Sequence, residues 1–264
     1  MRIGYCTNLI ATQIDGTGSE WIEKGKGTGF DYVELPLAQM MDLDDKEFSS
    51  LKERVDSSGL KCEACNNFFP GSIRVTGHAV DYDRIEEYLD RALGRAAQLG
   101  VKVIVFGSPK SKNVPEGYPM DKAWSQLVEL LKIIDPLVRT KGITVAIEPI
   151  CKLESNIINT AGEGLRLVRA VDRENIKLLV DYYHLVTEKE DPKIILSAGS
   201  YIKHVHCANP VGRGYPVEAE DGYVRFVSLL KRIGYEGRIS VEAYTKDFRY
   251  DAKRSVEILR QLAG

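Results

Sequence analysis

Residues 127–149 read LVELLKIIDPLVRTKGITVAIEP and contain one repeat of the pattern that decides the fold. The first part has apolar residues three and four positions apart, the spacing of one buried helix face. These residues are Leu127, Leu130, Leu131, Ile134 and Val138. Gly142 follows where a helix C-cap is expected, and the short apolar run Thr144–Glu148 is typical of a parallel strand covered on both faces. The segment therefore predicts an amphipathic helix that leads into a buried strand.

The same order recurs along the whole chain. Ile85, Leu89, Leu93 and Ala96 mark another amphipathic helix. Glycines at 59, 100 and 234 also stand shortly before a predicted strand, as helix C-caps do. The predicted strands are Arg2–Cys6, Tyr32–Leu35, Lys61–Cys65, Lys102–Phe106, Thr144–Glu148, Lys177–Asp181, Ile202–His206 and Arg238–Glu242.

Eight strands that alternate with helices over 264 residues predict an α/β protein, a single-domain (β/α)8 TIM barrel over residues 1–264. A doubly wound open sheet is the competing architecture. It normally has a glycine-rich phosphate turn after its first strand, whereas Thr7, Asn8 and Leu9 follow Cys6 here. We therefore expect the barrel, with its chemistry at the carboxyl ends of the strands.

Composition and charge narrow the function classes. The chain is 44% hydrophobic and 28% charged, with a net charge of −2, so it has ample apolar material for a core. This near-neutral balance gives no electrostatic signature for nucleic acid or an anionic membrane, and no apolar run reaches the ~20 residues of a membrane span. The start MRIGYCTNL lacks the apolar core of a signal peptide. We expect a cytoplasmic protein.

Five cysteines form no disulfide framework. Cys62 and Cys65 make a C-x-x-C, a spacing found in redox and metal sites, but they lie in or just after a strand and no second pair follows. We interpret them as buried, reduced thiols.

The ends of the last four strands carry the chemistry. The strands end TVAIE, KLLVD, IKHVH and RISVE, which places Glu148, Asp181, His206 and Glu242 at their carboxyl ends. Sequential strands are neighbours in a closed barrel, so these four side chains can converge. Three carboxylates in one place repel one another unless a cation lies between them. The sequence therefore predicts one divalent metal ion; oxygen ligands with one imidazole suit Mn²⁺, Mg²⁺ or Co²⁺, with Zn²⁺ and Fe²⁺ also allowed.

The other histidines are assigned differently. His204 and His206 lie on the same face of their strand, one layer apart. We expect His206 to be the ligand and His204 to be packed or hydrogen-bonded in the barrel interior. His78 has no partner in the sequence, and we expect it to be exposed or structural.

Several late motifs resemble the xylose isomerase-like TIM barrels, a family typified by tagatose 3-epimerase and hydroxypyruvate isomerase. The runs that carry the resemblance are IEPICKLESNIINT, LLVDYYH, HVHCANP, GYEGRISVEAY and VIVFGSPKSKNVPEGY. The resemblance covers essentially the whole chain. It implies a small sugar or sugar-derived substrate, one divalent metal, commonly manganese, and a chain that often forms homo-oligomers.

The resemblance also assigns roles to residues. It implies that Glu148 and Glu242 ligate the metal together with the other two strand-end residues and also act as the paired acid and base. It further implies that His184, Glu154 and Arg213 contact the carbonyl end of the substrate. To these substrate contacts we add Glu34, which lies near the end of the second strand.

Two segments depart from the family pattern. The acidic run 218–221 follows Arg213, and Lys110 and Lys112 stand near a position where the family often has an arginine. Both segments lie where the family selects its substrate, so the resemblance leaves the substrate open.

The expected reaction is 1,2-isomerisation or 3-epimerisation of a ketose or hydroxy-ketone, by proton abstraction next to a carbonyl through a metal-stabilised enediolate. A dehydratase of keto-inositols begins with the same step and is the nearest alternative. An endonuclease IV-like repair enzyme needs a three-metal cluster with many histidine ligands, and this chain has four histidines. A non-catalytic sugar-binding barrel is the remaining alternative, against which the intact set of four ligands argues.

Overall fold

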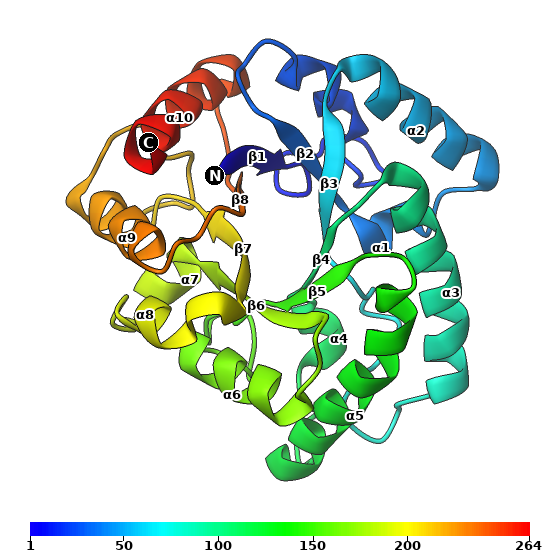
Figure 1. Cartoon of the computed structure of the whole chain (residues 1–264). Helices are drawn as coiled ribbons and strands as arrows, with labels where there is room; N and C mark the ends of the chain where they lie inside the picture. The colour runs from blue at the N-terminus through cyan, green and yellow to red at the C-terminus, as the bar shows by residue number, and fades with distance from the viewer.

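Eight parallel strands form a closed barrel in a computed structural model that describes all residues, 1–264. Each strand pairs with the next in sequence, and β8 closes the ring on β1 (Figure 1). The strands are β1 (Arg2–Cys6), β2 (Tyr32–Pro36), β3 (Lys61–Asn66), β4 (Val103–Phe106), β5 (Thr144–Ile147), β6 (Ile176–Asp181), β7 (Ile202–Cys207) and β8 (Arg238–Val241). The predicted TIM barrel is confirmed, and every predicted strand boundary lies within one residue of the observed one.

Helices form an outer ring around the barrel (Figure 1). They are α1 (Leu37–Met40), α2 (Asp45–Ser58), α3 (Tyr82–Leu99), α4 (Pro109–Lys112), α5 (Met120–Arg139), α6 (Ala161–Val171), α7 (Tyr182–Thr187), α8 (Ile194–Ala198), α9 (Asp221–Arg232) and α10 (Phe248–Ala263). None of these helices combines the length and the apolar character that crossing a membrane requires.

The first crossover differs from the predicted alternation. Between β1 and β2 the chain forms only two short 3-10 turns, Ser19–Trp21 and Glu23–Gly25, and no α-helix. Gly16, Gly18, Gly27 and Gly29 all adopt positive φ in this segment. Glycine is costly in a helix interior but suits such left-handed turns, so this segment covers β1 as a folded loop.

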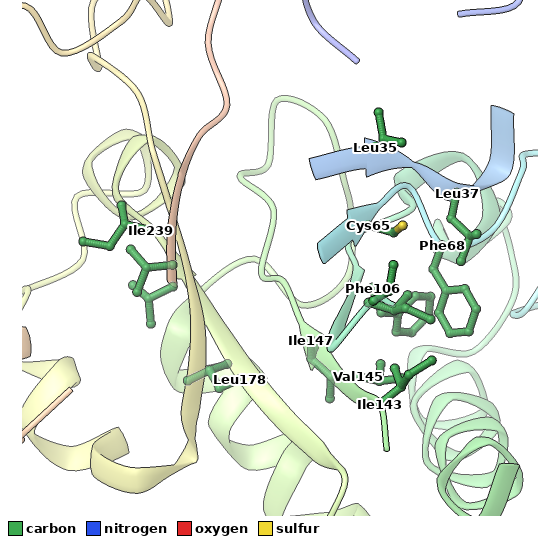
Figure 2. Close-up of a cluster of buried hydrophobic side chains, with 14 of the residues drawn as sticks. Leu35, Leu37, Cys65, Phe68, Phe106, Ile143, Val145, Ile147, Leu178 and Ile239 are labelled. Atoms are coloured by element: carbon green, nitrogen blue, oxygen red, sulfur yellow. The ribbon is translucent and has the colours of Figure 1, made fainter. Parts of the chain in front are cut away.

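Most of the core lies between the barrel and the helices. A cluster of 71 buried hydrophobic residues fills this layer. Part of it is shown in Figure 2, where Phe106 of β4 lies near Phe68 from the loop after β3. Their ring centroids are 6.3 Å apart in an edge-to-face arrangement, a favourable geometry for aromatic pairs.

A second, smaller layer fills the barrel interior. Side chains alternate along each strand, so every second residue points inward. Small and medium apolar residues form this layer together with Tyr32, and Gly4 makes room for it, since a Cβ on Gly4 would lie 2.4 Å from the Tyr32 ring. The inward positions above this layer are polar, which places the candidate site at the carboxyl ends of the strands.

Candidate metal centre

Four side chains converge at the mouth of the barrel. One ligand atom from each of Glu148, Asp181, His206 and Glu242 can be chosen so that all four lie within 4.8 Å of one another. All four residues are buried. The structure therefore brings together the whole ligand set that the sequence predicts.

Strand register explains this convergence. Asp181 of β6 is directly opposite His206 of β7, and Glu148 and Glu242 each follow the last residue of their strands, β5 and β8. Neighbouring parallel strands thus carry these residues to the same height. Glu148 also depends on Gly107, because a Cβ there would lie 2.3 Å from Glu148 Oε2.

The His206 imidazole has one nitrogen toward the centre and one toward the barrel interior. Its Nδ1 lies 3.2 Å from Glu148 Oε1 and 3.7 Å from Glu242 Oε2, while its Nε2 lies 3.0 Å from Glu34 Oε1. Burial lowers the pKa of His206, but the Glu34 carboxylate outweighs this and raises it well above the ordinary value. Because Nε2 faces Glu34, Nδ1 is the nitrogen that faces the carboxylates, and it can bind a metal once its proton has been displaced.

Asp181 shows that the protein alone does not complete this site. Its Oδ1 accepts the backbone N–H of Tyr183 at 2.8 Å, but its buried Oδ2 has no hydrogen-bond donor. Burial raises the pKa of Asp181 to about 7. A buried carboxylate with a free oxygen, beside two further carboxylates and an imidazole, is a donor set that fits a hard or borderline divalent cation.

Glu34 lies elsewhere than we predicted. It has no exposed surface, and its carboxylate bonds His204 Nε2 at 2.8 Å, His206 Nε2 at 3.0 Å and Ser240 Oγ at 2.5 Å. Alternation along β2 places it inside the barrel, beneath the mouth. We therefore assign Glu34 to holding the two imidazoles rather than to contacting the substrate. His204 is the buried, hydrogen-bonded histidine that we expected.

Arg213 connects two of the predicted site residues. Its guanidinium lies 2.6 Å from Glu242 Oε2 and 3.1 Å from Glu154 Oε1. Burial opposes the charge on Glu242, but Arg213 and His206 hold the pKa of this carboxyl well below its ordinary value.

His184 is buried and fixed in orientation. Its Nδ1 accepts the backbone N–H of Cys151 at 3.3 Å, and its Nε2 lies 3.7 Å from Asp181 Oδ2. Burial lowers the pKa of His184 to about 3, so the ring is neutral at physiological pH. With Nδ1 as an acceptor, the ring proton is on Nε2, on the side of the carboxylates.

Sequence reasoning missed three residues around this centre. Asn8 and Asn66 each donate a hydrogen bond to Glu242 Oε1 at 2.9 Å. Lys112, which we expected in a substrate-selecting segment, is instead buried, with its Nζ donating to the backbone carbonyl of Glu148 at 3.0 Å. Burial lowers the pKa of Lys112 to about 8. A polar residue just after a strand was the only available signal, and it is weak.

The remaining predicted residues lie outside the centre. His78 is exposed and stacks edge-on against Tyr118. All five cysteines are free and buried, and the Cys62 and Cys65 sulfurs lie 4.0 Å apart. The interpretation of the C-x-x-C as buried thiols is confirmed.

Comparisons with known proteins concern the family and the fold of the chain. The family model of the xylose isomerase-like TIM barrel matches residues 22–262. A probable ketose 3-epimerase of Synechocystis sp. is 24% identical over 247 residues, which cover 92% of this chain and 84% of that protein. A 2-oxo-tetronate isomerase of Pectobacterium atrosepticum is 29% identical over 201 residues, which cover 73% of this chain and 75% of that protein. Among solved structures, a D-allulose 3-epimerase from Methylomonas sp. superposes with a TM-score of 0.86 at 22% identity, covering 99% of this chain and 98% of that chain, and this likeness concerns the fold alone.

Proposed function

The chain belongs to the xylose isomerase-like TIM barrel family, and on this basis we propose that it is a divalent-metal-dependent enzyme that isomerises or epimerises a ketose or related hydroxy-ketone. The observation that carries the proposal is the group of three carboxylates and one imidazole at the carboxyl ends of β5 to β8. Relatives that match most of the chain are named ketose 3-epimerase or 2-oxo-tetronate isomerase, which supports a sugar or sugar-derived substrate.

We propose Glu148, Asp181, His206 and Glu242 as the metal ligands, with His206 binding through Nδ1. The predominance of oxygen donors favours Mn²⁺, while Mg²⁺, Co²⁺, Zn²⁺ and Fe²⁺ also suit the set. When bound, the ion would stabilise the negative charge that develops on the substrate oxygens as a proton leaves the neighbouring carbon.

Glu148 and Glu242 are the groups that we assign to proton transfer. They follow β5 and β8, which are three strands apart around the barrel, so they approach the centre from different sides. A carboxylate on each side of a carbon lets one remove a proton and the other return it, which epimerisation requires. Reprotonation at the adjacent carbon would give isomerisation instead.

His184 and Arg213 are the groups that we assign to orienting the carbonyl. The neutral imidazole can donate from Nε2 toward a carbonyl oxygen because its Nδ1 is already occupied by the Cys151 N–H. Arg213 carries a fixed positive charge next to Glu242, and Glu154 holds the other side of its guanidinium. Substrate atoms near Glu242 would therefore meet a charged donor.

Proton exchange tests the proposal directly. The manganese-loaded protein, the chelator-treated protein and the reloaded protein would each be incubated in D2O with D-fructose, D-psicose, D-tagatose and dihydroxyacetone, and the products followed by NMR and mass spectrometry. We expect deuterium at the carbon next to the carbonyl, loss of this exchange with chelator and recovery on reloading. A product that has lost one water molecule relative to the substrate would indicate a dehydratase. No exchange with any of the four compounds, or no retained divalent metal, would contradict the proposal.

A further inference from the structure

Two side-chain amides, one from the loop after β1 and one from the end of β3, meet at a single oxygen of Glu242. Asn66 is the last residue of β3, and Asn8 lies two residues beyond the end of β1. Each donates from Nδ2 to Glu242 Oε1, at 2.9 Å in both cases. Glu242 Oε2, in contrast, is the oxygen near His206 Nδ1 and Arg213. The two oxygens of this carboxylate thus have different surroundings.

The Glu242 carboxylate also determines which end of each asparagine amide faces it. An ionised carboxylate accepts hydrogen bonds and donates none, so each asparagine must present its NH2 group to Oε1. Each amide carbonyl is consequently turned away from Glu242. The Oδ1 atoms of Asn8 and Asn66 are both buried, and neither receives a hydrogen bond from any donor of the protein.

These two free carbonyls lie beside the proposed centre. Asn66 is 1% exposed, and burying an amide oxygen without a donor is unfavourable. Two such acceptors border the carboxylate that we assign to proton transfer. The hydrogen bonds to Glu242 Oε1 account for the NH2 groups of both asparagines. They do not account for the two Oδ1 atoms, which have no hydrogen-bond donor.

We propose that Asn8 and Asn66 form a subsite that binds hydroxyl groups of the substrate. In this subsite each Oδ1 accepts a hydroxyl hydrogen from the carbon chain beside the reacting carbon, while the NH2 groups keep Glu242 Oε1 in place. A neutral hydroxyl fits because it supplies a donor. A phosphate or carboxylate would instead bring lone pairs against two carbonyls and an ionised carboxylate. The substrate portion next to Glu242 is therefore an uncharged polyhydroxy chain.

The inference rests on the proposed function for the reacting carbon but can be tested without turnover. Asn66→Leu and Asn8→Leu remove the amides at similar volume, and Asn66→Ala provides a smaller replacement if Leu disturbs folding. Gln126→Leu is the matched control, because the Gln126 amide bonds the backbone of Gly77 on the outer side of the barrel. Melting temperature and manganese content would establish that each variant is folded and loaded.

Binding and kinetics give separate readouts. Calorimetry with the inert polyol D-glucitol on manganese-loaded protein should show a Kd raised about tenfold in the Asn8 and Asn66 variants and unchanged in Gln126→Leu. The KM for D-psicose should rise by about the same factor, whereas the KM for deuterium exchange into dihydroxyacetone should stay within about twofold, since that short substrate lacks the distal hydroxyls.

Each outcome decides the inference. Equal loss of kcat for both substrates with unchanged KM would show that the amides only position Glu242 and would overturn the hydroxyl subsite. Glucitol that fails to bind the unmodified protein, or that binds all variants equally, would overturn it as well. Absence of ketose turnover combined with the expected glucitol differences would reject the proposed reaction and retain the subsite.

Discussion

At the base of the barrel two arginines enclose one carboxylate, whereas at the mouth three carboxylates surround one imidazole. Glu63 of β3 lies 2.5 Å from Arg2 Nη2 and 2.7 Å from Arg238 Nε, so one carboxylate pairs with two guanidinium groups. At the mouth, Arg213 is the guanidinium that pairs with the cluster, and it contacts Glu242. Buried charges are normally paired, and the base follows this rule with protein groups alone.

This difference separates an arrangement that serves stability from one that serves a ligand. The charges at the base need nothing further. Those at the mouth leave the buried Asp181 Oδ2 without a hydrogen-bond donor. Because both clusters lie inside the same barrel, substitutions of similar chemistry at the two ends should give different results.

The largest difference should come from neutralising the proton-transfer groups. Glu148→Gln and Glu242→Gln keep the side-chain shape but remove the base, so deuterium exchange into the ketose should fall by about a thousandfold in each variant. The exchange rate would be measured at manganese concentrations that saturate each variant, with melting temperature as the folding control. Exchange within tenfold of the unmodified protein would exclude that residue as an acid–base group.

A smaller effect, on Mn²⁺ affinity, is expected from substitution of Glu34, which lies one layer below the mouth of the barrel. Glu34→Gln should weaken Mn²⁺ binding by about 10- to 100-fold, because a carboxylate that accepts from Nε2 of His206 orients the ring and makes Nδ1 a better ligand. Titration calorimetry with Mn²⁺ measures this effect. Glu63→Gln is the matched control, a carboxylate-to-amide change inside the same barrel, and equal Mn²⁺ affinity in both variants would rule out the positioning role of Glu34.

The contrast between the two ends was only partly visible in the sequence. Strand periodicity and the residues at the ends of the last four strands predicted the barrel and the convergence of Glu148, Asp181, His206 and Glu242, because neighbouring parallel strands end at the same level. Short apolar runs followed by a carboxylate or histidine were a strong pattern. The four side chains lie together as expected.

Contacts between distant strands could not be predicted in this way. The depth of Glu34 depends on its bonds to residues of β7 and β8, some 170 to 206 positions away. Asn8 and Asn66 are single polar residues without a pattern, and the burial of Lys112 depends on how the short helix α4 packs after β4. The expected regular alternation was wrong in the first crossover, where glycines at positive φ accompany two short 3-10 turns instead of an α-helix.

Lower pH should weaken Mn²⁺ binding at the mouth of the barrel. Burial raises the pKa of Asp181 to about 7, so below this pH the carboxyl is protonated and must lose its proton before a cation can bind. Mn²⁺ affinity should therefore fall as pH falls, by about 30-fold between pH 8 and pH 5.5 from the Asp181 proton alone, and by more because the raised pKa of His206 also holds a proton that the metal must displace. Calorimetry in buffers of different ionisation enthalpy would measure both the affinity and the released protons. Constant affinity across this range would contradict the raised pKa.

The smallest effect is expected at the base, and it should concern stability alone. Glu63→Gln removes the charge that holds Arg2 and Arg238 together, so the folded protein would keep two guanidinium groups close to a neutral amide. The side chain of Arg2 is 48% exposed, and water screens its charge, which limits the expected loss to about 1 kcal/mol in the free energy of unfolding. Urea unfolding of the metal-free protein would show this as a lower midpoint with an unchanged slope. Mn²⁺ affinity and deuterium exchange should stay the same, because no ligand of the proposed metal contacts Glu63. A tenfold change in either would mean that the two ends of the barrel are coupled through its interior, and the division between a structural end and a functional end would fail.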